Sequence, residues 1–350
     1  MRTSGSGTLT DVSAEPESIL GRFGIYVFPW GKRPPKIGEI VELANLAEEL
    51  GFDSVHIPWH FTLPTNWIFP DFGNRFLVDP LVVLPILARE TKRVRLGLNA
   101  AILPILHPFF WAQYLAAIDV VSEGRLIAGV AIGWWEDDFK IGLAPLGERG
   151  RRMDEALDII SKLWRGEEIA QAGQFWDASG MSLDPRPVQA EVPIWIGGGA
   201  RSVDRAGRWA SALMPLNPSP EEVKEQFKPQ LAAAGAVHSR QVELAIMNYG
   251  VFSEDKDWID TEIRPKLREC VGFDVAGPNG LDAELDRRIM FGSPEQAAAC
   301  ANRLFAAGVD YIVMDFQLHG WESPDFAREQ MTRFVEDVAP RIHAQPPRRH

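Results

Sequence analysis

The clearest pattern along the chain lies between residues 125 and 164. Residues 126–132 read LIAGVAI and carry no polar side chain, which is typical of a strand covered on both faces, as in a parallel sheet. Gly133 ends this run, and an aromatic and acidic turn at residues 134–139 follows. Beyond Arg151 the apolar residues recur at helical spacing, namely Met153, Ala156, Leu157, Ile159, Ile160, Leu163 and Trp164. The stretch predicts one strand followed by one helix.

The same alternation of an apolar run and a helical period repeats through most of the chain. Strands are predicted at residues 23–29, 54–60, 94–103, 126–132, 193–196, 212–216, 242–252 and 311–316. Helices are predicted at residues 37–50, 108–122, 151–164, 202–209, 220–234 and 254–270, with others beginning at Asp79 and Ser293 and a last one ending near residue 338. Eight such units favour a closed barrel over an open sheet. We expect an α/β fold, a (β/α)8 TIM barrel with insertions.

The remaining segments define the domain organisation. Residues 1–20 are predicted to be a flexible leader and residues 341–350 a flexible tail, because both are polar and lack periodicity. Residues 21–340 are expected to form a single domain. Insertions are expected near residues 166–193, with a small hairpin around residues 173–183, and near residues 274–291, which begin with Pro-Asn-Gly.

Composition narrows the functional classes. A formal net charge of −12 argues against a surface that follows nucleic-acid phosphates. The two cysteines, Cys270 and Cys300, have no spacing typical of a disulfide framework or a metal site. The leader lacks the apolar core of a signal peptide, and no run reaches the roughly 18 apolar residues of a membrane span. The expectation is a soluble cytoplasmic protein that binds neither nucleic acid nor membrane.

Five segments together resemble one protein family. They are GFDSVHIPWHF, VRLGLNAAILPILHP, DVVSEGRLIAGVAIGWWEDDF, GERGRRMDEALDIISKLW and PVQAEVPIWIGGGA, and they occur in the family's order over about residues 21–338. This arrangement resembles the bacterial luciferase-like monooxygenases, especially the branch that includes deazaflavin-dependent oxidoreductases. The resemblance implies a TIM barrel that holds reduced FMN or the deazaflavin coenzyme F420 at its C-terminal mouth. It also implies a separate flavin or deazaflavin reductase as a partner, and a homodimer.

Two segments are candidate cofactor-binding elements. Gly197, Gly198 and Gly199 end the fifth predicted strand and precede a helix, so their backbone N–H groups can approach a cofactor phosphate, with Arg201 assisting. The alternative is that these glycines form an ordinary tight turn between strand and helix and bind no phosphate. The resemblance also implies a non-proline cis peptide at Asn99–Ala100 that supports the flavin ring. The alternative is a normal strand in which Asn99 satisfies the neighbouring backbone.

His60 is the candidate catalytic residue. The resemblance places it beside the reactive ring face, where a histidine can move a proton or stabilise a developing charge. Trp59 precedes it where deazaflavin-dependent relatives carry an acid, and the alternative is a structural histidine at the rim of the barrel. Trp134 stands where the sugar-phosphate dehydrogenases of the family carry a catalytic glutamate, so that activity is not expected.

Two further groups of polar residues lie near these candidates in the sequence. Glu136, Asp137 and Asp138 are expected mainly to cap and solvate their loop, and the alternative is that they reach the mouth of the barrel. His56 and His60 do not form a metal-binding pair, because residues this far apart on one strand are separated by about 13 Å. No metal site is predicted.

Aromatic residues suggest the character of the substrate. The chain has 12 tryptophans, many of them at predicted strand-to-helix loops. Trp59, Trp67, Trp134 and Trp135 are expected to line a pocket for a small organic molecule, sizeable and either hydrophobic or aromatic. Packing beneath long loops explains part of this content equally well.

The sequence therefore predicts a flavin-dependent oxidoreductase of the luciferase-like monooxygenase type. It would use reduced FMN with oxygen, or hydride transfer with the deazaflavin. Two alternatives remain open: a non-catalytic flavin-binding barrel, and a TIM-barrel lyase or hydrolase without flavin.

Overall fold

The computed structural model describes residues 19–31, 35–61, 76–271, 280–320 and 322–343. The predicted leader and tail lie largely outside these ranges, as does most of the long connection after the second barrel strand, including Trp67. Within the described ranges, residues Ile19–Arg22 form a short 3-10 helix that leads into the first strand.

Eight parallel strands close into a barrel, as predicted. Pairing of Ala212 with Glu243 joins the sixth strand to the seventh and closes the ring. In order around the barrel the strands are β1 (Phe23–Tyr26), β3 (Ser54–Ile57), β5 (Arg95–Ile102), β6 (Leu126–Ala131), β7 (Ile194–Gly197), β8 (Ala212–Met214), β9 (Glu243–Phe252) and β11 (Tyr311–Asp315). Two further strands, β2 (Trp30–Gly31) and β4 (Phe76–Leu77), pair antiparallel with each other.

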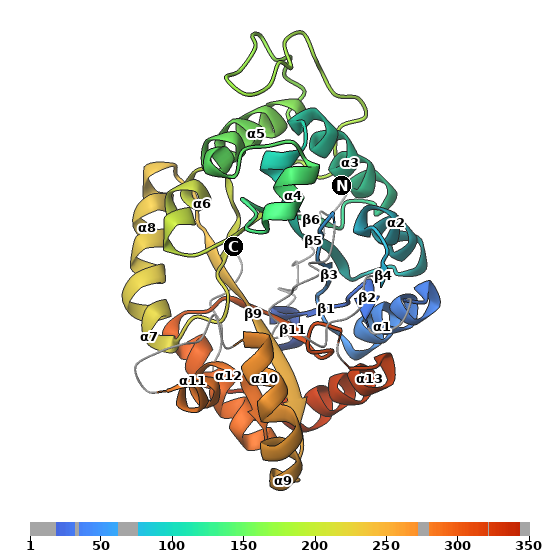
Figure 1. The fold of residues 1–350 in the computed structure, drawn as a ribbon, viewed down its shortest axis with the longest axis vertical. Helices are drawn as coiled ribbons and strands as arrows, with labels where there is room; N and C mark the ends of the chain where they lie inside the picture. Colours follow the sequence, from blue (N-terminus) through green and yellow to red (C-terminus); the bar gives the residue numbers. More distant parts are fainter. Residues whose placement is uncertain (1–18, 32–34, 62–75, 272–279, 321, 344–350) are drawn as a thin grey trace, which may run out of the picture.

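The helices surround the barrel (Figure 1). Their apolar stripes pack on the outer face of the strands, and the core runs continuously between the two layers. They are α1 (Ile37–Leu50), α2 (Pro80–Glu90), α3 (Pro108–Val121), α4 (Glu136–Ile141), α5 (Arg149–Trp164), α6 (Val203–Trp209), α7 (Pro220–Glu222), α8 (Lys228–Val237), α9 (Lys256–Trp258), α10 (Arg264–Val271), α11 (Leu281–Arg288), α12 (Pro294–Ala307) and α13 (Pro324–Arg333).

Local sequence signals set several helix ends. Asp79 caps α2 by accepting a hydrogen bond from the N–H of Leu81 at 2.8 Å, as expected, and Ser293 forms a capping box with Gln296 at the start of α12. The predicted helices at residues 220–234 and 254–270 are each interrupted by one π-helical turn, at Val223–Phe227 and Ile259–Ile263. A five-residue turn does not change the apolar period enough to be seen in sequence.

The insertion at residues 166–193 contains no strand, so the expected hairpin is wrong. It is a loop that projects from the barrel beside α5 and α3 (Figure 1). Two carboxylates fix it: Glu155 on α5 accepts the N–H of Trp176 at 3.0 Å, and Asp119 on α3 accepts the N–H of Val188 at 2.7 Å. These side chains satisfy part of the loop's backbone, and Ile169 exchanges backbone hydrogen bonds with Gly180 and Met181 at 2.8 and 3.1 Å without a strand being formed.

The second insertion, near residues 274–291, is structured where it is described. It contains α11 and an additional strand, β10 (Met290–Gly292), which pairs parallel with the end of β9. The sequence analysis missed this strand, because three residues give no measurable period. Residues 272–279 lie outside the described ranges.

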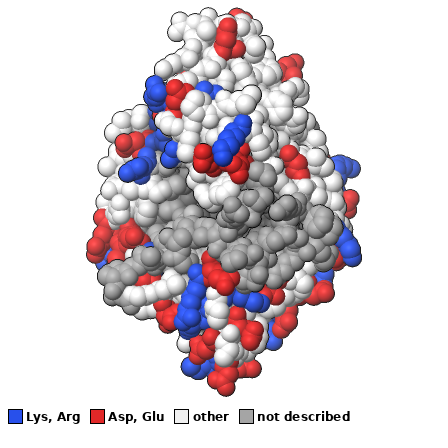
Figure 2. All heavy atoms as spheres, viewed as in Figure 1, with Lys and Arg blue, Asp and Glu red and all other residues white. Residues whose placement is uncertain are grey.

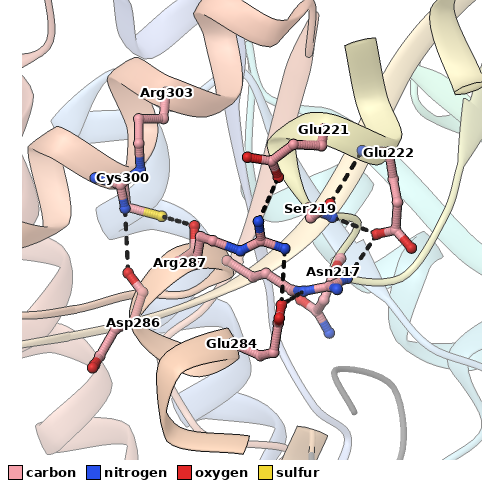
Figure 3. Close-up of polar contacts among 10 residues, drawn as sticks. Asn217, Ser219, Glu221, Glu222, Glu284, Asp286, Arg287, Cys300 and Arg303 are labelled. Atoms are coloured by element: carbon pink, nitrogen blue, oxygen red, sulfur yellow. Dashed lines mark hydrogen bonds and ion pairs between the residues drawn. The ribbon is translucent and has the colours of Figure 1, made fainter. Parts of the chain in front are cut away.

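Ion pairs attach α11 to α7, near the carboxyl ends of β8 and β9. Arg287 and Glu284 face Glu221 and Glu222 across the gap between the helices (Figure 3). Arg288 donates to Glu284 at 2.8 Å and to Glu222 at 2.7 Å. Arg288 and Glu284 are both buried, so their charges are stabilised by this network of ion pairs, in which Arg287 also donates to Glu284 at 3.0 Å.

Arg288→Met is expected to lower the free energy of unfolding by about 3 kcal/mol, because it removes the buried guanidinium shared by Glu284 and Glu222 and leaves the buried Glu284 with only the part-exposed Arg287 as a partner. Urea denaturation measures this. Arg268→Met is the matched control, since the Arg268–Asp282 pair is exposed, and it should cost about 1 kcal/mol or less. Equal losses for the two variants would contradict a buried role for Arg288.

Buried polar groups fill the barrel interior near the start of β3 and β11. His56 stacks on Trp195 with ring centroids 5.2 Å apart, and its Nε2 lies 2.7 Å from Ser54 Oγ. Ser54 Oγ lies 2.6 Å from the hydroxyl of Tyr311. Burial lowers the pKa of His56 to about 3, so the ring is neutral. Among the described residues there is no group of three side chains able to hold a metal ion.

Candidate functional site

The carboxyl ends of the parallel strands converge on one mouth, where active sites of this fold lie. Following the strand order around the ring, β5, β6 and β7 lie opposite β9, β11 and β1. The sequence-predicted residues Asn99, Ala100 and Gly197 are on the first group of strands, and His60 follows β3 beside that group.

The strand β5 carries a bulge at the predicted position. The register of β5 against β6 shifts between Leu98 and Ala101, and the Asn99–Ala100 peptide is cis, as expected. Asn99 is buried, and its amide Nδ2 lies 2.9 Å from the sulfur of Met214 on β8. A thioether is a weak acceptor, so this amide retains hydrogen-bonding capacity for a stronger partner.

Gly129 on β6 makes room for the bulge. A Cβ added to Gly129 would collide with the carbonyl of Leu98 and stand 2.8 Å from Asn99 Oδ1 and 3.0 Å from Asn99 Cα. This glycine lies inside an apolar run without any motif, so the sequence does not mark it as a site residue. Its role, which is to leave room for the bulge of β5, follows only from the pairing of β6 with β5.

Gly129→Ala is expected to lower the free energy of unfolding by about 1–3 kcal/mol, because the backbone of β5 must move to accept the methyl group. Gly38→Ala on α1 is the control. Nothing lies within 4 Å of a Cβ there, so the change should be neutral or stabilising. Urea denaturation of both variants measures the difference, and an unaffected Gly129→Ala protein would contradict the close approach.

The glycine turn adjoins this bulge. A Cβ on Gly197 would lie 3.5 Å from Ala131 Cβ and 4.0 Å from Ala100 Cβ. Gly198 has a φ of 145°, and Gly199 precedes the 3-10 turn Ala200–Ser202 that leads into α6. Gly199 and Arg201 are exposed. The structure therefore brings Ala100 and Gly197 together on a surface of very small side chains.

His60 forms a part-buried hydrogen bond with an acid from a distant part of the sequence. Its Nδ1 lies 2.8 Å from Asp138 Oδ2, and Asp138 Oδ1 accepts the backbone N–H of Phe61 at 3.0 Å. Asp138 is fully buried, whereas the His60 side chain keeps 15% exposure. Asp138 was expected to solvate its loop with Glu136 and Asp137, and this is wrong for Asp138 alone.

The short helix α4 explains the position of Asp138. In its sequence EDDFKI, Asp138 and Phe139 are buried, while Glu136 is exposed and Asp137 pairs with Lys140. Of these three neighbouring acids, Asp138 alone is buried. The signal available in sequence was weak, because a six-residue helix carries less than two turns of pattern.

The hydrogen bond to Asp138 favours one tautomer of the His60 imidazole. A carboxylate only accepts, so Nδ1 of a neutral His60 carries the proton and Nε2 is left as the acceptor. This arrangement of an imidazole oriented by a buried acid is the one that general acid–base sites use.

The predicted tryptophans occupy different places. Trp134 is 52% exposed, and its ring lies 6.5 Å from that of His60 and 5.5 Å from that of Trp135. Trp59 is instead buried in the core against Trp111, at 5.1 Å, because it faces the opposite side of the chain from His60. The structure therefore brings Trp134 and Trp135 to the mouth with His60 and does not bring Trp59.

Comparison with known proteins identifies the family. The sequence model of the luciferase-like monooxygenase family matches residues 21–339, so the chain belongs to this family. It is 25% identical to limonene 1,2-monooxygenase of Rhodococcus erythropolis over 349 residues, covering 92% of this chain and 86% of the relative. It is 33% identical to the F420-dependent glucose-6-phosphate dehydrogenase of Microbacterium testaceum over 201 residues, covering 55% of this chain and 57% of that protein.

Solved structures share the fold. A monooxygenase from Streptomyces bottropensis aligns with a TM-score of 0.77 at 23% identity, over 91% of this chain and 99% of its own. The oxygenating constituent of 3,6-diketocamphane monooxygenase from Pseudomonas putida, in complex with FMN, aligns with a TM-score of 0.72 at 18% identity, over 93% of this chain and 100% of its own. At these identities the likeness concerns the fold.

The surface gives two further observations. On the face shown in Figure 2, acidic and basic side chains of the described residues are interspersed without a continuous basic area. Within the described ranges, the helices are all too short or too polar to cross a bilayer.

Proposed function

We propose that this protein is an oxidoreductase that binds reduced FMN or the deazaflavin F420 at the barrel mouth and acts on an uncharged, hydrophobic organic substrate. The observation that carries the proposal is the contact between the β5 bulge and the glycine turn. Ala100, Ala131 and Gly197 lie close together and carry only methyl groups or hydrogen, and the His60–Asp138 pair comes from the segment after β3 and from α4, which follows β6.

These residues fit a flavin-type cofactor. The surface around Gly197 would receive the ring, and Asn99 would offer its amide to a polar ring edge. The exposed turn at Gly198, Gly199 and Arg201 would hold the phosphate, because glycine lets backbone N–H groups approach an anion. When bound, reduced FMN activates oxygen, whereas the deazaflavin transfers a hydride without oxygen.

The chain itself would orient the reactants and handle a proton. His60 would accept a proton through Nε2, or return it after protonation, while Asp138 keeps the ring in one orientation. Trp134 and Trp135 would cover the substrate and reduce its contact with water. Trp134 supplies no acid, so a reaction that needs a carboxyl group at that position is not proposed.

Fluorescence titration tests the proposal. Tryptophan emission is recorded while FMN, reduced FMN without oxygen, or F420 is added to separate samples, and oxygen uptake after admission of oxygen to the reduced FMN sample is compared with that of free reduced FMN. Tight binding of F420 alone would define a hydride-transfer enzyme. Preference for reduced FMN with oxygen uptake would define a monooxygenase supplied by a separate reductase. Binding of none of the three would contradict the proposed function.

A further inference from the structure

Met214 adjoins both parts of the candidate cofactor site. It is the last residue of β8, and it pairs with Gly197 in the register of β7 and β8. Its carbonyl accepts the N–H of Gly198 at 3.1 Å, and its sulfur lies 2.9 Å from the Nδ2 of Asn99. One methionine therefore joins the β5 bulge to the glycine turn.

The Met214 side chain lies inside the barrel, at the mouth. The strands β5 and β8 are separated by β6 and β7 in the ring, so the contact with Asn99 crosses the interior. Met214 packs in the same buried cluster as Trp195 and Tyr311, whose rings meet at 5.2 Å across the barrel. Because Met214 ends its strand, it belongs to the end of the interior where the carboxyl ends of the strands converge.

Exposure distinguishes the methionines at the mouth from the more deeply buried ones. Met214 and Met247, on the neighbouring strands β8 and β9, keep 4% and 5% exposure. Exposure of 0 or 1% is found for Met153, Met290, Met314 and Met331. Hydrogen peroxide is close to water in size, so it reaches the atoms that water reaches. Met181, on the projecting loop, is 39% exposed and is accessible in any case.

The cysteines do not compete for peroxide. Cys270 and Cys300 are both buried. Burial raises the pKa of Cys300 to about 12 and that of Cys270 well above its usual range, so neither supplies the thiolate that reacts with peroxide. The accessible thioethers are therefore the more reactive sulfur atoms of the two kinds.

We propose that hydrogen peroxide oxidises Met214 to its sulfoxide and that the sulfoxide closes the cofactor site. The sulfur lone pair attacks one peroxide oxygen, an S–O bond forms, and the O–O bond breaks. The leaving hydroxide takes the proton of the transferred oxygen and departs as water, so the sulfur loses two electrons and the peroxide gains them. This inference rests on the proposed function and names a regulation of that site.

The oxidant can arise at the site itself. Reduced flavin that meets oxygen without a substrate to oxidise releases hydrogen peroxide, whereas the deazaflavin does not use oxygen. Peroxide released at the mouth is formed beside Met214, because this residue adjoins the surface proposed for the ring. Oxidation of Met214 then stops a cycle that consumes reduced cofactor without making product.

The sulfoxide competes with the cofactor for Asn99. A thioether is a weak acceptor, whereas a sulfoxide oxygen is polar and is costly to bury without a donor. The Asn99 Nδ2, 2.9 Å from the sulfur, is the donor already in place. The amide proposed to meet the ring edge is then occupied, and the added oxygen takes up space beside Gly197. The expected loss is about tenfold in cofactor affinity, the worth of one hydrogen bond.

Peptide mass spectrometry after graded treatment of the cofactor-free protein with hydrogen peroxide measures the oxidation. Met181 is expected to oxidise first, Met214 and Met247 next, and the four most buried methionines only on unfolding. Thermal unfolding verifies that the treated protein keeps its fold. A Met214 as resistant as the fully buried Met314 overturns the proposal.

The capture of the amide is measured by 1H–15N NMR. The side-chain amide signal of Asn99, assigned by its absence from an Asn99→Asp variant, should shift when the wild type is oxidised. It should keep its position when Met214→Leu is treated in the same way. An unshifted signal in wild type with Met214 fully oxidised overturns the capture of Asn99.

Fluorescence titration before treatment and after removal of peroxide measures the effect on cofactor binding. The dissociation constant of the wild type is expected to rise about tenfold, whichever cofactor binds. Met214→Leu conserves volume and should stay within about twofold of its own untreated value. Met247→Leu is the matched control, with nearly the same exposure on the next strand, and should lose affinity as the wild type does. If Met214→Leu does not fold, the wild-type loss must follow the oxidised fraction of Met214 rather than that of Met181.

The failures are distinguishable. Equal losses in wild type and Met214→Leu, or no loss in fully oxidised wild type, overturn the role of Met214 and leave the proposed function standing. If no cofactor binds before treatment, the proposed function fails, and the effect of oxidation on binding fails with it. Mass spectrometry and NMR then still decide whether Met214 is oxidised and whether its sulfoxide captures Asn99.

Discussion

His60→Ala is expected to lower kcat by roughly 10²- to 10⁴-fold and to leave the cofactor dissociation constant within about threefold of wild type, as is typical when a general acid–base is removed. The reason is geometric, since His60 is the partly exposed member of a pair whose acid is fully buried. Steady-state kinetics with the preferred cofactor, together with fluorescence titration, separate the two effects. Addition of free imidazole should restore part of the lost turnover.

Asp138→Asn tests the positioning role of the acid. Asp138 holds the proton on Nδ1 of His60, whereas an asparagine Nδ2 at that place would donate to Nδ1 and put the proton on Nε2. Nε2 then no longer accepts, so kcat should fall with little change in KM. Unchanged turnover in His60→Ala, or no rescue by imidazole, would remove His60 from the reaction.

Gly197→Val is expected to weaken cofactor binding on the order of a hundredfold, equal to about 2.7 kcal/mol. A Cβ at this position sits in ordinary contact with Ala131 and Ala100, so the further methyl groups must project into the space above them. The fold should tolerate the change, because the contacts at 3.5 and 4.0 Å are not clashes. Fluorescence titration measures the affinity, and thermal unfolding verifies the fold.

Gly147→Val is the matched control for this prediction. Gly147 lies in the exposed 3-10 turn Leu146–Glu148, and a Cβ there meets nothing within 4 Å. Its cofactor affinity should equal that of the wild type. If Gly197→Val also bound the cofactor normally, the surface formed by Ala100, Ala131 and Gly197 would not be the ring site.

The barrel could be predicted from sequence because its strands and helices have clear patterns of apolar residues. The uninterrupted apolar run at residues 126–132 corresponds to β6, and the helical period at residues 37–50 corresponds to α1 at both ends. Short elements escaped prediction, because β10 and α4 are shorter than any reliable period. The insertion at residues 166–193 does not form the predicted hairpin, since the carboxylates of Glu155 and Asp119 bind its backbone and only the isolated pairing of Ile169 with Gly180 and Met181 crosses it.

The candidate site was predictable only in part. The resemblance to a known family located the cis peptide at Asn99–Ala100, which no local propensity indicates. Asp138 was not foreseen as the partner of His60, because the two are 78 positions apart in sequence and meet only through the packing of α4.

A crystal structure of the complex with the preferred cofactor, FMN or F420, tests the central claim most directly. We predict that the ring lies in contact with Asn99, Ala100 and Gly197, with a phosphate within hydrogen-bond distance of the Gly198–Arg201 backbone and His60 beside the ring. A cofactor bound outside the mouth, or inverted so that its phosphate lies by His60, would contradict the account.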